Sequence, residues 1–199
     1  MQPKTYYHIY NHANGFENLF RSQENYRYFM QRWIKYIEPV ADTYVYCLMP
    51  NHIHFLIQTK SEKDVSTNLK YSEALPFGKF GTFQKVVSKQ FANLFSSYTQ
   101  AYNKMYQRRG SLFVPNFKRQ EVPSDKDLTA VAHYIHSNPV HHGFVKSIDL
   151  WKWSSYQTLL STKPTRLARD ETISWFGNQN FFLSMHQQAI ELKEKEWND

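Results

Sequence analysis

The sequence predicts an α+β fold: an antiparallel sheet with helices packed on one face, plus a C-terminal helical appendage. Short aromatic and β-branched runs, which are typical of strands, recur along the chain. Between them lie longer segments whose apolar residues recur at spacings of three and four, which is typical of amphipathic helices. The first six predicted elements follow the order β-α-β-β-α-β. This is the split arrangement of ferredoxin-like (RRM-like) domains.

The first four elements come from the N-terminal part of the chain. Residues 5–12, TYYHIYNH, are predicted as a strand that ends before an Asn-Gly turn signal. Residues 22–38 are predicted as an amphipathic helix with Ser22 as its N-cap. Residues 43–49 and 52–58 are predicted as two strands. The Pro-Asn turn between them favours an antiparallel hairpin.

The other two elements of the unit lie in the middle of the chain. A long helix is predicted over 82–108, where an apolar stripe runs between basic ends and Gly110 follows as a stop signal. Residues 111–122 are predicted as the fourth strand. Because Pro115 interrupts this run, the strand is expected at a sheet edge or around a bulge.

A further helix completes the predicted domain. It is expected over 124–138, with Ser124 near its start, and the Asn138-Pro139 pair is expected to end it. We therefore expect a principal domain over 1–146. Residues 147–199 are expected to form a helical extension packed on or beside that domain.

The composition narrows the classes of function. The chain carries 24 Lys plus Arg against 17 Asp plus Glu, a net charge of +7, and 17% aromatic residues, which together favour a phosphate-bearing partner. Cys47 is the single cysteine, so an intramolecular disulfide and a cysteine zinc cluster are excluded. The chain has no signal-peptide core, and no apolar run reaches the about 18 residues of a membrane span. We expect a soluble, cytoplasmic protein without a membrane partner.

Two histidines one residue apart form the first candidate site. His52 and His54 lie in the stretch YCLMPNHIHFLIQ. Because side chains alternate along a strand, both imidazoles are expected on one face and within reach of one divalent ion, while Ile53 points into the core. Spacing alone also allows two ordinary histidines on a half-solvated sheet face.

The second candidate pair lies on the helix predicted over 124–138. Tyr134 and Asn138 are four residues apart, so they share a helix face. Tyr134 offers a hydroxyl nucleophile, and Asn138 offers a carbonyl oxygen that suits a hard divalent ion. The alternatives are a core aromatic and a helix-terminal residue. The nearby histidines at 136, 141 and 142 are expected to make surface or local contacts.

Basic residues form the third candidate site. They flank the long predicted helix and the strand that follows it, where they could track a phosphate backbone while aromatic residues stack on bases. The alternative is an ordinary solvated face. The candidate DNA-binding residues are Lys85, Lys89, Lys104, Arg108, Arg109, Lys118 and Arg119.

Four segments together resemble a known family. LMPNHIHFLI, RRGSLFVPNFKRQEV, HYIHSNPVHHGFV and WKWSSY occur here in the order and at the spacing of the REP-associated tyrosine transposases. These belong to the wider single-tyrosine HUH transposases, named for a histidine, hydrophobic residue, histidine motif. The resemblance extends from about residue 5 to residue 160 and implies a ferredoxin-like fold.

The resemblance implies a role for each of four residues. His52 and His54 match the histidine pair and would ligate Mg²⁺ or Mn²⁺. Tyr134 matches the nucleophile, and Asn138 falls where related transposases place a third polar ligand. The implied substrate is single-stranded or hairpin DNA, cleaved and rejoined through a 5′-phosphotyrosine intermediate by a monomer or homodimer that associates with the nucleoid when DNA-bound.

Two other functions are compatible with the sequence. One is a non-catalytic ferredoxin-like module that binds nucleic acid through sheet aromatics. The other is a different HUH nuclease, either a replication initiator or a relaxase. Cleavage of a hairpin substrate would separate the enzyme from the module, and nicking of origin-like DNA would identify the other nuclease class.

Overall fold

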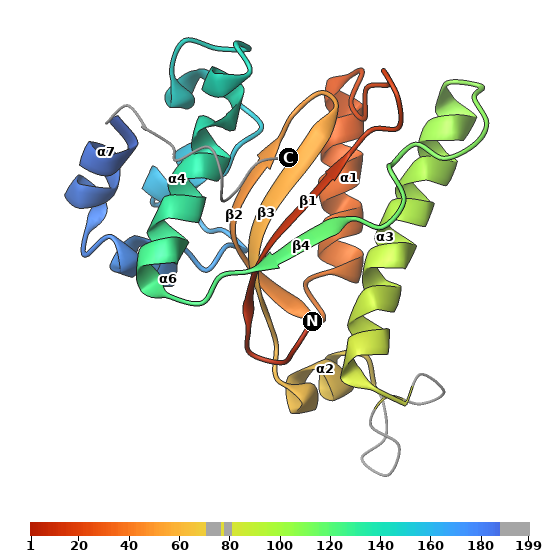
Figure 1. The fold of residues 1–199 in the computed structure, drawn as a ribbon, viewed down its shortest axis with the longest axis horizontal. Coiled ribbons are helices and arrows are strands. Elements are labelled where there is room, and N and C mark those ends of the chain that lie inside the picture. Colours follow the sequence, from red (N-terminus) through yellow and green to blue (C-terminus); the bar gives the residue numbers. More distant parts are fainter. Residues whose placement is uncertain (71–76, 78–80, 188–199) are drawn as a thin grey trace.

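The fold is built from a small sheet, with helices on both of its faces (Figure 1). The computed structural model describes residues 1–70, 77 and 81–187. Its strands are β1 Tyr6–His12, β2 Ala41–Leu48, β3 His52–Thr59 and β4 Lys118–Glu121. Its helices are α1 Gln23–Tyr36, α2 Glu62–Asn68, α3 Phe83–Met105, α4 Asp125–His141, the 3₁₀ helix η2 Ile148–Leu150, α5 Tyr156–Leu160, α6 Arg169–Trp175 and α7 Gln179–Gln187.

The four strands form one antiparallel sheet in the order β2-β3-β1-β4. The predicted α+β class and the β-α-β-β-α-β order of the major elements are confirmed. The fourth strand is much shorter than predicted, because only residues 118–121 pair with β1. Before them, a single bridge joins Ala13 to Phe113. Pro115 cannot donate to a ladder and Asn116 has φ 62°, so a regular strand begins only after them.

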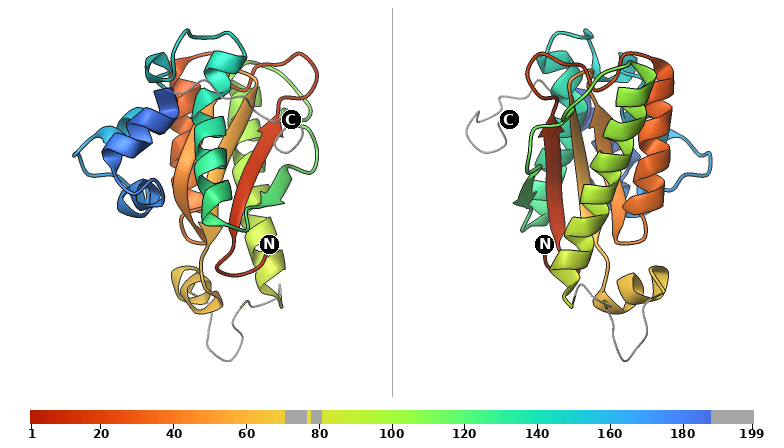
Figure 2. Two further views of the ribbon diagram at one scale, coloured as in Figure 1. Left: turned by 60° about the vertical axis from the view of Figure 1, so that its left-hand side comes forward. Right: turned by 90° about the vertical axis from the view of Figure 1, so that its right-hand side faces the viewer.

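One face of the sheet is covered by α1 and α3, as the prediction of helices on one face requires (Figure 2). Trp33 of α1 stacks on Phe55 of β3 with ring centroids 3.5 Å apart. Its indole N–H donates to Thr43 Oγ1 at 2.9 Å. Ile53 is buried in the same core, so it points away from the face on which His52 and His54 lie.

The opposite face is covered by α4, which adds a layer that the prediction did not include. The apolar residues Leu128, Val131 and Ile135 of this helix share a buried cluster with Val45 and Leu56 of the sheet. Behind α4 lie η2, α6 and α7, each of which contacts it (Figures 1 and 2). The sheet is therefore sandwiched, and α4 faces the side that carries the histidine pair.

The predicted end of α4 at Asn138 is wrong by about one turn, because the helix continues through Pro139 to His141. A proline forfeits its own backbone hydrogen bond and crowds the preceding turn. Here only a short final turn follows it, and that turn is closed by the His142 N–H donating to the Asn138 carbonyl at 3.0 Å. Asn138 itself is therefore held in helical geometry.

Hydrogen bonds attach the residues after 147 to β2. The Leu48 N–H donates to the Trp153 carbonyl, and the Ser155 N–H donates to the Tyr46 carbonyl, both at 2.9 Å. Within the described part of the chain, no helix is both long enough and apolar enough to cross a membrane.

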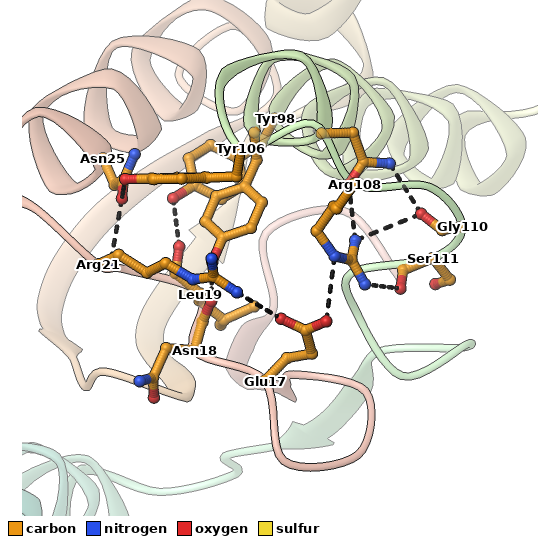
Figure 3. Close-up of polar contacts among 12 residues, drawn as sticks. Glu17, Asn18, Leu19, Arg21, Asn25, Tyr98, Tyr106, Arg108, Gly110 and Ser111 are labelled. Atoms are coloured by element: carbon orange, nitrogen blue, oxygen red, sulfur yellow. Dashed lines mark hydrogen bonds and ion pairs between the residues drawn. The ribbon is translucent and has the colours of Figure 1, made fainter.

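A network of polar contacts fixes the loop that follows β1 (Figure 3). Glu17 lies between two guanidinium groups, accepting from Arg21 at 3.0 Å and from Arg108 at 3.1 Å. The Tyr98 hydroxyl of α3 donates to the Leu19 carbonyl at 2.6 Å. The loop after β1 is thereby joined to α3 and to the turn after it.

Candidate active site

The register of the sheet gathers histidines on the face covered by α4. His12 of β1 lies directly opposite His52 of β3, and Tyr10 lies opposite His54. Directly opposed residues in an antiparallel pair share a face, and alternate residues of one strand do too. His8 therefore joins the same face. Among these five side chains, His8, His52 and His54 are buried.

His52 and His54 are adjacent on this face, as their spacing predicts. Their ring centroids are 5.2 Å apart, and the ring planes are nearly perpendicular at 89°. The ring of His12 stacks on His52 at 4.9 Å, and the ring of the exposed His142 lies 4.8 Å from it. The pair is thus enclosed by other imidazoles instead of lying on an open, solvated face.

Helix α4 brings Tyr134 and Asn138 against this pair. The Oδ1 atom of Asn138 lies 2.9 Å from His52 Nε2. The ring of Tyr134, one turn earlier, meets the ring of His54 edge-on, with centroids 5.7 Å apart. The structure therefore brings together all four residues that the resemblance implicates, although they come from two segments about 80 residues apart.

Each histidine of the pair has a polar contact at its Nδ1 atom. His52 Nδ1 lies 2.9 Å from Asn51 Oδ1, and His54 Nδ1 lies 3.0 Å from His8 Nε2. In both rings Nδ1 contacts a neighbouring side chain, so Nε2 is the nitrogen that would ligate a metal ion. For His52 that nitrogen is the one that meets Asn138.

The donor chemistry fits a hard divalent ion. Two ligands at adjacent corners of an octahedron, each about 2.1 Å from Mg²⁺, lie about 3 Å apart, and the His52 Nε2 to Asn138 Oδ1 distance of 2.9 Å matches this separation. Amide oxygen is an ordinary ligand of hard ions such as Mg²⁺ and Mn²⁺, and imidazole nitrogen is an ordinary ligand of divalent first-row transition metals, to which Mn²⁺ belongs. Within the described ranges, no three His, Cys, Asp or Glu side chains form a metal-binding group. The candidate set differs from such a group because its third member is an amide.

Tyr134 lies in an aromatic environment within reach of these donors. Only 7% of its surface is exposed. Its ring meets both His8 and His54 edge-on, at centroid distances of 5.8 and 5.7 Å. Tyr134 was predicted either as a core aromatic residue or as the nucleophile. The two predictions are compatible, because its packed ring lies beside His52 and His54, which would hold the ion.

The structure does not bring the seven predicted basic residues into one cluster. Lys85 and Lys104 lie near opposite ends of α3, about 28 Å apart along the helix. Lys118 pairs with Tyr10 and so lies on the face of His54. Arg119 points to the other face, where it lines a pocket of about 570 Å³ beside α3.

The remaining basic residues differ in their contacts. Arg108 is half-buried: besides Glu17, it donates to Asn103 Oδ1 at 2.7 Å and to the Ser111 carbonyl at 3.0 Å. Lys89 and Arg109 are exposed. Arg108 therefore has a structural role whether or not it also meets DNA, whereas Lys89, Arg109 and Lys118 are accessible to a partner.

Sequence reasoning missed the contribution of β1 to the site. His8 and His12 fall on alternate positions of YYHIYNH, the same period-two signal that identified His52 and His54. Their significance depends on the register between β1 and β3, which neither segment contains by itself. His136 was expected to make surface or local contacts. It is completely buried, with Nε2 2.7 Å from Ser155 Oγ and Nδ1 2.9 Å from His186 Nε2.

Comparisons with known proteins found similarity in sequence and in fold. The chain is 28% identical over 117 residues to a Haemophilus influenzae protein described as "Putative REP-associated tyrosine transposase". The match covers 58% of the chain and 58% of the relative, so the chain spans about three-fifths of that relative's length. No family model matches the chain.

A solved structure shares the fold. It is described as the structure of the REP-associated tyrosine transposase bound to a REP hairpin, and it matches with a TM-score of 0.58 at 16% identity. The match covers 82% of this chain and 84% of the other. The structural match shows the fold, and the sequence match shows similarity to one protein described as a REP-associated tyrosine transposase.

Proposed function

We propose that this chain acts as a REP-associated tyrosine transposase, and its sequence similarity to a protein of that description and its shared fold support the proposal. Its reaction would be the nicking and rejoining of single-stranded DNA that carries a hairpin. One observation carries the proposal: α4 presents Tyr134 and Asn138 to the face of the sheet on which His52 and His54 lie, with Asn138 Oδ1 2.9 Å from His52 Nε2.

The substrate class is supported by the structural relative, which is bound to a REP hairpin. We propose the same class of DNA for this chain. Lys118 is the basic residue best placed to meet the substrate near the site, because it is exposed and pairs with Tyr10 on the site's face. The other six basic residues stay candidates for phosphate contacts further along the DNA, including Arg119 on the opposite face.

The metal would be Mg²⁺ or Mn²⁺, held by His52, His54 and Asn138. A divalent ion there would polarise the scissile phosphate and offset the charge that develops on it. All three protein donors are neutral when ligating, so the ion would keep its full charge for the phosphate. The pairing of imidazoles with an amide, without a carboxylate, suits a site that must attract an anion.

Tyr134 would supply the nucleophile. Its oxygen would form a bond to the scissile phosphorus, the bond from phosphorus to the 3′ oxygen would break, and that oxygen would leave as a 3′-hydroxyl after taking up a proton. A tyrosine hydroxyl has an ordinary pKa of about 10, so its proton must be removed with assistance during attack. The link from tyrosine to the 5′ phosphate retains the energy of the broken bond. A second 3′-hydroxyl could therefore reverse the attack without ATP.

We further propose that residues 1–146 form the HUH single-tyrosine transposase domain, and that the extension from 147 supports it from behind α4. The hydrogen bonds from Leu48 and Ser155 that join this extension to β2 support a structural role for the extension. The protein would act in the cytoplasm, as a monomer or homodimer, and would associate with the nucleoid when DNA-bound.

The nucleophile is tested by incubating the protein with end-labelled hairpin DNA and Mn²⁺. The parent protein is expected to form a covalent adduct, and Tyr134→Phe is expected to form none, because phenylalanine lacks the attacking oxygen. Tyr10→Phe is the matched control, since Tyr10 stacks 5.9 Å from the same His54 ring, and it should retain the adduct. An adduct that persists in Tyr134→Phe would identify another nucleophile. Hairpin binding by the parent without any adduct would indicate a binding module.

A further inference from the structure

A third imidazole is built into the site beside the predicted pair. His8 is completely buried on β1. Its Nε2 lies 3.0 Å from His54 Nδ1, and the two rings are stacked with centroids 5.2 Å apart and planes within 17° of each other. The ring also meets Tyr134 edge-on at 5.8 Å. His8 therefore contacts both a proposed metal ligand and the proposed nucleophile.

The contact is made at the nitrogen of His54 that would not bind the ion. A histidine that ligates a metal through one nitrogen usually donates its other N–H to a fixed partner, which sets both the tautomer and the ring orientation. For His54 Nε2 to present a lone pair, the proton must be on Nδ1. His8 Nε2 must then be the acceptor. The 3.0 Å separation of the two nitrogens suits this role.

His52 provides an internal comparison. Its Nδ1 lies 2.9 Å from Asn51 Oδ1, so an amide oxygen occupies the place that an imidazole nitrogen occupies at His54. The two proposed ligands thus meet partners of different chemistry, one in the turn before β3 and the other on β1. Asn51 is the immediate neighbour of His52, whereas His8 reaches His54 only because β1 pairs with β3.

We propose that His8 is a positioning residue that holds the proton of His54 on Nδ1 and aims Nε2 at the metal site. This inference rests on the proposed function, because it assigns His8 to the same site. It adds a residue of β1 to a constellation otherwise drawn from β3 and α4. Losing the acceptor should weaken metal binding by about 10- to 100-fold, which is the usual effect of removing such a partner.

Two polar, uncharged variants test the proposal. His8→Gln places an amide oxygen at about the reach of the lost Nε2, whereas His8→Asn is one methylene shorter and should not reach His54. Mn²⁺ binding is measured without DNA, from the electron paramagnetic resonance signal of the free ion. Hairpin affinity in EDTA and the unfolding temperature are measured for each variant as controls for folding.

The expected result is a loss of Mn²⁺ affinity of about 10- to 100-fold in His8→Asn, with recovery of most of it in His8→Gln and unchanged hairpin affinity in both. Parent-like Mn²⁺ affinity in His8→Asn would overturn the proposal. An equal loss in both folded variants would overturn it as well, because the effect would then follow packing and not the acceptor. If the parent itself binds no Mn²⁺ and forms no adduct, the proposed function fails and the inference fails with it. If the parent binds Mn²⁺ and forms the adduct but the His8 variants do not give the expected affinities, the inference fails and the proposed function stands.

Discussion

At the scale of single residues, the distinctive feature of the site is an amide where metal sites often have a carboxylate. Asn138 is 1% exposed, and its Oδ1 atom is the closest described partner of His52 Nε2. Its spacing to Tyr134 and the family resemblance predicted Asn138 as a metal ligand, and that role stays a prediction. Spacing by itself could not separate a ligand from a residue that ends a helix, because that choice depends on what faces α4.

The proposed ligand role of Asn138 predicts a contrast between two substitutions of similar size. Asn138→Leu removes the oxygen and should lower Mn²⁺ affinity at least about tenfold, equivalent to about 1.4 kcal/mol of binding free energy. Asn138→Asp keeps an oxygen in the same place and should retain binding. Calorimetric titration of Mn²⁺ into each folded variant measures the difference. Equal affinities for the parent and Asn138→Leu would exclude the amide from the ligand set.

At the scale of elements, the network of polar contacts around Glu17 includes one of two neighbouring arginines and not the other. The sequence could not distinguish the two. Arg108 donates to Glu17, Asn103 and Ser111, whereas Arg109 is exposed. Both were predicted as DNA contacts, since adjacent arginines at a helix end have the same local sequence signal. Only the packing of the loop after β1 against the turn after α3 tells them apart.

Matched alanine variants of these arginines test the distinction. Arg108→Ala should lower the free energy of unfolding by about 1 kcal/mol, because it removes hydrogen bonds to the half-buried Glu17 and Asn103 side chains and to the exposed Ser111 carbonyl. Arg109→Ala should leave the free energy of unfolding unchanged. If Arg109 contacts a phosphate, its loss should also reduce the salt dependence of hairpin affinity by about one ion. Urea unfolding and hairpin titrations across a salt series measure both effects. Reduced stability in Arg109→Ala with none in Arg108→Ala would contradict the account.

The helices also show how well apolar periodicity predicts the positions and ends of helices. The positions of α1, α3 and α4 were predicted within a few residues, because their apolar stripes are regular. The continuation of α4 past Pro139 was not predicted, since the local rule for proline takes no account of packing. The side chain contacts on both sides of Pro139, including the one between Asn138 and His52, outweigh that local preference.

At the scale of the whole molecule, the layer behind α4 is joined to it by a chain of buried histidines. His136 contacts Ser155 and His186, and His186 Nδ1 lies 2.8 Å from the Phe182 carbonyl of α7. The ring of His133 also contacts that of His186, with centroids 5.0 Å apart. Burial is the main cause of a lowered pKa in all three histidines. The pKa falls to about 4 for His133 and to about 3 for His186, and for His136 it falls well below its ordinary value.

These lowered pKa values predict a loss of stability in acid. In the unfolded chain the histidines take up protons near pH 6.5, but in the folded protein they do so only near pH 4 or below. Unfolding therefore binds protons between these limits. The free energy of unfolding should fall as the pH drops from about 6.5 towards 4, by up to about 1.4 kcal/mol per pH unit for each histidine.

The variant His186→Gln isolates this effect, because glutamine can still meet His136 but does not titrate. Urea unfolding between pH 5 and pH 8 should give a shallower decline in acid for the variant than for the parent protein. The comparison at pH 8 shows what the substitution costs when the histidines of the parent are neutral. Identical declines in both proteins would show that His186 is not responsible for the acid sensitivity.

The overall architecture was predictable in part. The order of strands and helices follows from local periodicity, and so does the antiparallel hairpin that carries the histidine pair. The second helical layer and the participation of β1 in the site were not predictable. They depend on which face of the sheet α4 covers and on the register of β1 with β3, and both are properties of long-range packing.

The central claim is that Tyr134 becomes covalently linked to DNA at a site formed with His52, His54 and Asn138. The most direct measurement is mass spectrometry of the proteolysed adduct that forms on a hairpin substrate with Mn²⁺. The 5′ phosphate of the cleaved strand should be found on the peptide that contains Tyr134. A phosphate mapped to any of the other tyrosines, or hairpin binding without an adduct, would contradict it.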